Sequence, residues 1–467
     1  MGASHSSGAF NIGAFRDVLF NSNGAGLPLP SSITFEGIMK EYFYQTGLKV
    51  SDKLLEAAYS IAIDHDPITL EKQLHLALGL HSCKDGLNER KDLNLVIVLD
   101  ISGSMGSAMS SKEKTKMQVA NEVICEIIEN LREFERLGIV LFDDKAETLL
   151  PLTIVQDLDK KSLKETVLNI KEKGSTNFEA GMQRGIDLFS SLDSSDLSNS
   201  NRIIYLTDAC PNVGGTATLD ILTKDANSGP YSIFSTFVGI GLDFNSKIVD
   251  ELTRVRGCNY FSVKSTEEFK KILNEDFNYI VTPICYNVKL TMECENYEIE
   301  KCFGTNFAGE STGEIMKVDT CSAGQLDERG VKGGIILLRL KAKNNFKGVS
   351  NVKLTLSYET VEGKKVREEK HVNVDSNLEN YFETNGIRKA IALVRYVENV
   401  KGYLQEMDTV QQSHDYTTNT KPSTSSEEWN SKFGQLLNYF TNEINEIRDE
   451  TMQQEVDAIN KFIEFSK

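Results

Sequence analysis

The sequence predicts an α/β fold with a doubly wound parallel sheet, inserted in or flanked by an antiparallel β-sandwich and followed by a helical region. Residues 91–283 alternate short apolar runs with amphipathic helical stretches, which is typical of βαβ units. Residues 284–376 change to an apolar–polar period of two, and residues 377–467 return to helical spacing. With 467 residues, the chain exceeds the roughly 250–300 at which a single core stops growing. We therefore expect several domains.

The α/β part begins with LNLVIVLD at 93–100, a continuous apolar run of the kind expected of a central strand that helices cover on both faces. Helical spacing follows at 113–131, and LGIVLFD at 137–143 predicts the next strand. The remaining elements are expected to be helices at 160–172 and 177–192, a strand at 202–207, a helix near 218–226, strands at 232–241 and 260–263, and a helix at 265–281.

Antiparallel β-structure is expected on both sides of this α/β part. Alternate residues are apolar from Leu74 to Leu80 and again from Val288 to Cys294. An isolated hairpin would be only marginally stable, so we expect segment 1–90 to contribute strands to the same sandwich as residues 284–376. The C-terminal helices are expected at 385–407 and 427–447.

Composition restricts the classes of function. The 51 Lys and Arg residues against 68 Asp and Glu give a net charge of −17, which argues against nucleic acid as a partner. No apolar run reaches the roughly 18 residues of a membrane span, and the N-terminus lacks the pattern of a signal peptide. The eight cysteines contain no C-x-x-C pair, so we expect reduced, packed thiols; the four from Cys285 to Cys321 could pair if the protein were secreted. The sequence favours the cytoplasm over an extracellular location.

The N-terminus fits one lipidation pattern. Met1-Gly2-x-x-x-Ser6 matches the N-myristoylation motif, in which Gly2 becomes the acylated residue in a eukaryote. A single myristoyl chain anchors weakly without a polybasic second signal, and the first basic residue here is Arg16. Acylation would therefore give only weak, reversible membrane association.

Oxygen-bearing side chains end the first α/β strand. Asp100, Ser102 and Ser104 form a D-x-S-x-S motif at the carboxyl end of a parallel strand, where open α/β sheets bind ligands. One carboxylate and two hydroxyls are hard donors, which suit Mg²⁺, Mn²⁺ or Ca²⁺ rather than zinc. Thr176 lies in a loop that opens a helix, and Asp208 follows the apolar strand at 202–207. All five side chains are expected at the same edge of the sheet.

In this order and spacing the five residues resemble the metal-ion-dependent adhesion site of the von Willebrand factor A family, over about 92–282. The resemblance implies that Ser102, Ser104 and Thr176 ligate one cation directly and that Asp100 and Asp208 often act through water. It also implies that the Asp or Glu of a partner protein completes the coordination. Met105-Gly106 follows Ser104 where integrin β chains carry an acidic pair for a second calcium ion, so we expect a single metal. Asp143-Asp144 is interpreted as a strand-end turn or salt bridge.

The wider chain also resembles the bacterial YfbK-type proteins, in which an N-terminal segment similar in arrangement to residues 10–47 precedes such a domain. We therefore expect a cation-dependent interaction module that captures an acidic group of a protein partner. The alternative is a structural subunit whose metal site is structural or vestigial. An enzyme is disfavoured because G-x-x-x-x-G-K-[ST], H-E-x-x-H and G-x-S-x-G are missing and the six histidines are scattered.

Overall fold

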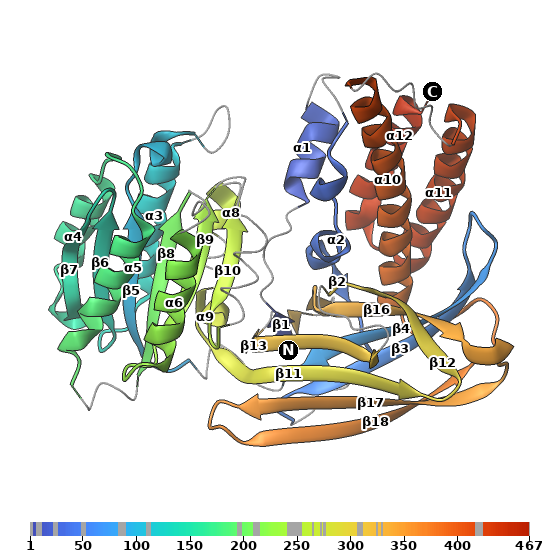
Figure 1. The fold of residues 1–467 in the computed structure, drawn as a ribbon, viewed down its shortest axis with the longest axis horizontal. Coiled ribbons are helices and arrows are strands. Elements are labelled where there is room, and N and C mark those ends of the chain that lie inside the picture. The colour runs from blue at the N-terminus through green and yellow to red at the C-terminus, as the bar shows by residue number, and fades with distance from the viewer. Residues whose placement is uncertain are drawn as a thin grey trace.

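The chain folds into an α/β domain, a β-sandwich and a layer of helices that covers one sheet of the sandwich (Figure 1). This is a computed structural model, in which the α/β domain lies at the left of Figure 1 and the helical layer lies above the sandwich. The structure describes residues 3–5, 12–21, 27–47, 53–82, 90–108, 114–193, 199–208, 215–240, 255–263, 266–270, 273, 277–305, 312–323, 326–327, 330–415 and 424–466.

The α/β domain is built on a sheet whose central strand is β5 (Leu93–Asp100), in which every residue is buried. Its strand order is β10-β9-β8-β5-β6-β7, and all neighbours pair in parallel except β6 and β7. The other strands are β6 (Arg136–Phe142), β7 (Ala146–Ile154), β8 (Ser200–Thr207), β9 (Phe234–Ile240) and β10 (Asn259–Val263). The expected doubly wound α/β fold is therefore confirmed.

The antiparallel edge strand β7 differs from the parallel sheet that the sequence predicts. Only 143–145 separate β6 from β7, and a parallel connection needs a dozen or more residues. The chain turns back instead: the backbone N–H of Asp143 donates to the Lys145 carbonyl at 2.9 Å, and the Lys145 N–H donates to Asp143 Oδ1 at 3.0 Å. Asp143 thus lies in a strand-end turn, as its sequence position indicates.

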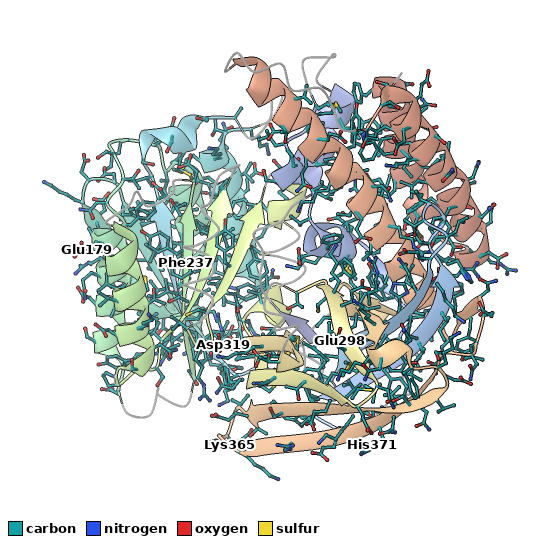
Figure 2. The ribbon with its side chains drawn as sticks, turned by 45° about the vertical axis from the view of Figure 1, so that its right-hand side comes forward. Glu179, Phe237, Glu298, Asp319, Lys365 and His371 are labelled. Carbon is teal, nitrogen blue, oxygen red and sulfur yellow. The ribbon has the colours of Figure 1, made fainter. Side chains whose placement is uncertain are left out.

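Helices cover both faces of this sheet. The helix α3 fills one side with the buried residues Val123, Ile124 and Ile127, while Met182 and Phe189 fill the other. Phe237 of β9 lies inside this domain in Figure 2, whereas Lys365 and His371 mark the sandwich. The helices are α3 (Lys116–Asn130), α4 (Lys160–Leu168), α5 (Phe178–Asp187), α6 (Gly215–Ser228), α8 (Thr266–Lys270) and α9 (Phe277–Ile280).

The sandwich combines strands that precede the α/β domain in sequence with strands that follow it, so this domain is inserted in the sandwich. One sheet has the order β12-β16-β4-β3-β19, so two strands that precede the insertion pair with strands that follow it. The opposite sheet has the order β1-β13-β11-β17-β18. The strands are β1 (Ala3–His5), β3 (Glu56–His65), β4 (Lys72–His81), β11 (Pro283–Cys294), β12 (Tyr297–Phe303), β13 (Glu314–Ala323), β16 (Ile335–Ala342), β17 (Val349–Thr360), β18 (Lys365–Asp375) and β19 (Tyr381–Phe382).

The period-two pattern of β4 separates two cores. Leu76 and Leu78 pack into the sandwich with Leu290 of β11, whereas Ala77 faces the helices. The small residue on the second face lets the long helix α10 approach the sheet. The helical layer consists of α1 (Gly13–Asn21), α2 (Phe35–Glu41), α10 (Asn385–Asp415), α11 (Ser426–Ile447) and α12 (Gln453–Phe465). A small sheet of β2 (Phe43–Tyr44), β14 (Leu326–Asp327) and β15 (Gly330–Lys332) lies beside it.

Within the described part of the chain, no helix is long and apolar enough to cross a membrane. The six cysteines whose side chains are described are free thiols, namely Cys125, Cys258, Cys285, Cys294, Cys302 and Cys321. Cys285 and Cys321 stand opposite each other on β11 and β13.

Candidate metal centre

Asp100 ends the buried strand β5 and organises the turn that follows it. Its carboxylate Oδ1 accepts the backbone N–H of Ser102 at 2.8 Å, and Oδ2 accepts the Thr207 hydroxyl at 2.6 Å. The residue is fully buried. Burial raises the pKa of the Asp100 carboxyl, while the hydrogen bonds from Thr207 and Ser102 act in the opposite direction.

The two serines connect this turn to the end of β8. Ser104 lies in a short 3-10 helix, η2 (Gly103–Gly106), and its hydroxyl donates to Asp208 Oδ1 at 2.7 Å. The Ser102 and Ser104 hydroxyl oxygens are 3.1 Å apart. Ser102 is buried, whereas Ser104 is exposed. Asp100, Ser102, Ser104 and Asp208 therefore form one hydrogen-bonded group, here called the oxygen cluster, that reaches solvent at Ser104.

The loop that carries Thr176 lies beside the oxygen cluster. The backbone N–H of Gly103 donates to the Gly174 carbonyl at 3.2 Å, and the N–H of Lys173 donates to the Ile101 carbonyl at 2.6 Å. Gly174 has φ +72°, a conformation that side-chain-bearing residues rarely adopt. Thr176 itself is half-buried. Among the described residues, its hydroxyl forms no hydrogen bond with the oxygen cluster, so the two loops are joined here through their backbones.

Two residues that the sequence did not single out contact the oxygen cluster. Thr207 donates to Asp100, as described above; its position next to Asp208 was the available signal. Lys116, the first residue of α3, places its Nζ 2.8 Å from Asp208 Oδ2. Both oxygens of Asp208 therefore have partners, one from Ser104 and one from Lys116.

The donor set fits a hard divalent cation. Within the described residues, no group of three or more His, Cys, Asp or Glu side chains is placed to hold a metal ion. The oxygen cluster instead combines two carboxylates with two hydroxyls, which are the ligands that Mg²⁺ and Ca²⁺ prefer. It converges from β5, β8 and the turn after β5, as expected at the carboxyl edge of an open sheet.

The Asp143-Asp144 pair is not part of the oxygen cluster. Asp144 accepts a hydrogen bond from the Ser175 hydroxyl, and Lys173 Nζ lies 4.0 Å from Asp143 Oδ2, so both aspartates have partners in the turn and loop. Gly2 lies outside the described residues. The adjoining strand β1 pairs with β13 through Ala3 and Ala323.

Comparison with known proteins identifies the inserted domain. Residues 95–210 match the family model of the von Willebrand factor type A domain. The chain is 29% identical over 202 residues to inter-alpha-trypsin inhibitor heavy chain H1 of Mesocricetus auratus, covering 41% of this chain and 21% of that protein. It is 22% identical over 292 residues to the uncharacterized protein YfbK of Escherichia coli (strain K12), covering 61% of this chain and 48% of that one. The chain thus spans between about a fifth and about half of the length of these relatives.

A similar solved structure is a von Willebrand factor type A protein from Catenulispora acidiphila, with 14% sequence identity and a TM-score of 0.47. The alignment covers 85% of this chain and 89% of that chain. The family match begins within the first strand and includes the whole D-x-S-x-S motif and Asp208. The inserted α/β domain is therefore a von Willebrand factor type A domain, in a chain that resembles the YfbK-type proteins.

Proposed function

We propose that the chain is a divalent-cation-dependent interaction module, in which one Mg²⁺, Mn²⁺ or Ca²⁺ ion captures an Asp or Glu side chain of a partner protein. Von Willebrand factor type A domains generally mediate interactions between proteins and often bind a divalent cation. The observation that carries the proposal is the oxygen cluster, whose hard donors converge from separate strands and reach solvent at Ser104.

Each residue has a definite place in this proposal. Ser102, Ser104 and Thr176 would hold the cation through their hydroxyls, and Asp100 and Asp208 would orient those hydroxyls and balance the charge. Asp208 already accepts from Ser104, and the Asp100 carboxylate accepts the backbone N–H of Ser102. The bound cation would supply an electrophilic position that a carboxylate can occupy. Because Ser104 is exposed, a partner side chain can approach from solvent.

A second candidate function is a structural subunit in which the cluster needs no metal. The ion pair between Lys116 and Asp208 favours it, since the ammonium already balances one carboxylate. The two candidates differ in reversibility. An interaction module loses its partner on chelation and regains it with Mg²⁺, whereas a structural subunit stays assembled.

Calorimetric titration of Mg²⁺, Mn²⁺ and Ca²⁺ into the chelated full-length protein tests the first step. We expect saturable 1:1 binding, weakened by about tenfold or more in Asp100→Ala and in Asp208→Ala because each removes a carboxylate that faces the cation. Asp187→Ala, at the far end of α5, is the matched control and should bind like the wild type. Equal affinity in all four proteins would contradict the assignment of the centre.

We also propose that the protein acts in the cytoplasm, with weak and reversible membrane association only if Gly2 is acylated. The mass of the N-terminal peptide, measured after expression with a myristoyltransferase and with Gly2→Ala as control, tests the acylation. An unmodified wild-type peptide would remove the membrane part of this proposal.

A further inference from the structure

Lys116 is held against the oxygen cluster by its side chain and by its backbone. Its Nζ lies 2.8 Å from Asp208 Oδ2, with 17% of the lysine side chain and 1% of the aspartate side chain exposed. Its backbone N–H donates to the carbonyl of Ser107 at 3.0 Å, directly after the D-x-S-x-S turn. The ammonium is therefore a fixed part of the centre rather than a mobile surface charge.

This position is electrostatically unfavourable for the helix itself. Lys116 is the first residue of α3, and the first turn contains no acidic residue. A helix N-terminus carries partial positive charge, so a cation there destabilises the helix. The turn is otherwise well capped, because Thr115 and Gln118 form a reciprocal capping box. Lys116 therefore does not stabilise the start of α3, which the capping box already satisfies. The ion-pair partner of its ammonium is Asp208.

The formal charges around the oxygen cluster determine the net charge that a bound cation leaves. The carboxylates of Asp100 and Asp208 contribute two negative charges, and Lys116 returns one positive charge. A divalent cation would then leave the centre with one excess positive charge, which a single carboxylate from outside neutralises. Without Lys116, the two carboxylates would neutralise the cation unaided. On the neighbouring loop, Glu172 and Lys173 are exposed, so solvent screens their charges, and Lys173 already faces Glu147 at 3.3 Å and Asp143 at 4.0 Å.

We infer that Lys116 weakens the binding of the bare cation and makes the loaded centre selective for an acidic partner group. This inference rests on the proposed function. It means that metal and partner carboxylate bind cooperatively, because the carboxylate compensates the repulsion between the ammonium and the cation. The centre would therefore bind its cation on its own, and bind it more tightly when the partner carboxylate is also present.

The test removes the charge of Lys116 and keeps the length of its side chain. In Lys116→Met, calorimetry should show Mg²⁺ binding about tenfold tighter or more. Acetate binding to the Mn²⁺-loaded protein, followed by water-proton relaxation as acetate displaces metal-bound water, should become about tenfold weaker or more. Lys116→Arg keeps the charge. Lys114→Met removes an exposed charge that pairs with Glu122 outside the centre. Both should stay within about threefold of the wild type.

The opposite signs of the two effects separate this role from a structural one. If Lys116→Met weakens both metal and acetate binding, or changes neither, the inference is wrong. Lys116→Gln provides a second uncharged variant if Lys116→Met does not give the wild-type circular dichroism spectrum. If Asp100→Ala abolishes metal binding while Lys116→Met and Lys116→Gln behave like the wild type, only this inference fails. If the wild-type protein binds no metal, the proposed function fails and the inference falls with it.

Discussion

His75 is a buried histidine that stays neutral. It lies in the middle of β4 with 1% of its surface exposed, and its Nδ1 is 3.7 Å from Asp64 Oδ1. Burial lowers the pKa of the His75 imidazole well below its ordinary value, and the charges of Arg395 and Arg339 lower it further. Protonation is thus easier in the unfolded chain than in the folded one.

The stability of the protein should therefore fall as the pH drops below the unfolded-state value of 6.5. Below that pH the unfolded chain binds a proton that folded His75 does not, so this residue contributes a loss of up to about 1.4 kcal/mol per pH unit. Above pH 6.5 neither state is protonated there and the contribution is constant. Urea unfolding of the wild type and His75→Gln between pH 5 and 8 measures it. Equal pH slopes in the two proteins would show that His75 is protonated when folded.

The sequence predicts most of the residues of the candidate centre but not Lys116, whose ammonium pairs with Asp208. The motif spacing places Asp100, Ser102 and Ser104, and strand order places Asp208 beside them, because parallel strands end at one edge of a sheet. Lys116 could not be found this way. Its partner lies 92 residues away, and the contact depends on how α3 packs against the end of β8.

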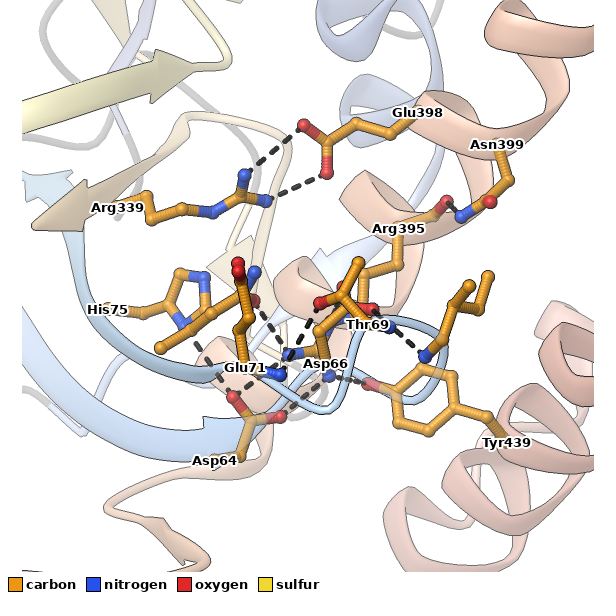
Figure 3. Close-up of polar contacts among 12 residues, drawn as sticks. Asp64, Asp66, Thr69, Glu71, His75, Arg339, Arg395, Glu398, Asn399 and Tyr439 are labelled. Carbon is orange, nitrogen blue, oxygen red and sulfur yellow. Dashed lines mark hydrogen bonds and ion pairs between the residues drawn. The ribbon is translucent and has the colours of Figure 1, made fainter. Parts of the chain in front are cut away.

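Among the elements, α10 is fixed to the sandwich by a buried ionic network (Figure 3). Arg395, with 1% of its side chain exposed, donates to Asp64 at 2.6 Å and 3.0 Å and to Gln73 at 2.9 Å. One turn further on, Glu398 accepts from Arg339 of β16 at 2.8 Å. The network crosses from the helical layer to strands on both sides of the insertion in sequence.

Arg395→Met should destabilise the protein by about 3–5 kcal/mol, because it leaves the carboxylate of Asp64 buried without its cation. Replacing both partners, as Arg395→Met with Asp64→Leu, should recover much of that loss, since the carboxylate of Asp64 is then gone and only the partly exposed Asp66, 3.6 Å from Arg395 Nε, loses its cation. Chemical unfolding of the two variants measures both effects. The matched control is Lys461→Met on α12, whose exposed charge should matter by less than about 0.5 kcal/mol. A double variant no more stable than Arg395→Met would refute the electrostatic explanation.

Some elements carried too little local signal to be expected. The strand β1 has three residues and exists through its pairing with β13, which lies more than three hundred residues away. The strand β7 follows an apolar run, but its antiparallel direction results from the short turn before it. In contrast, α12 has Val456, Ile459 and Phe462 buried at helical spacing, so the signal for this helix was present in the sequence.

In the whole molecule, the von Willebrand factor type A domain contacts the sandwich through residues just before β10. The guanidinium of Arg256, just before β10, lies 3.9 Å from the centre of the Tyr286 ring and 2.9 Å from Glu359 Oε1. The backbone N–H of Gly257 donates to the Thr320 hydroxyl at 2.7 Å. These contacts lie where the chain leaves the inserted domain and enters β11.

Arg256→Ala should loosen this junction while leaving the centre at the opposite edge of the sheet intact. Removal of the stacked and ion-paired guanidinium should cost about 1–3 kcal/mol of coupling between the domains. We expect calorimetric unfolding to separate into two transitions, with Mg²⁺ affinity unchanged. Arg184→Ala, an exposed arginine on α5, serves as control. A single transition shifted as a whole would indicate that other contacts couple the domains.

The sequence favours the insertion, because alternating strands precede and follow the α/β part and the hairpin that precedes it would be only marginally stable alone. The pairing partners could not be read in the same way. That β4 lies between β3 and β16 depends on which edges meet once both sheets are formed, and period-two patterns alone do not distinguish these pairings.

The strand order around the insertion has a consequence for how the protein is made. On the ribosome, β3 and β4 emerge early, but the neighbour of β4, β16, is translated only after the whole inserted domain. At about 5–20 residues per second, this delay is on the order of tens of seconds. The inserted domain is contiguous and can fold during that interval, whereas the β3–β4 hairpin waits with an open apolar face. A nascent chain stopped just before β16 should therefore be the stage most dependent on chaperones.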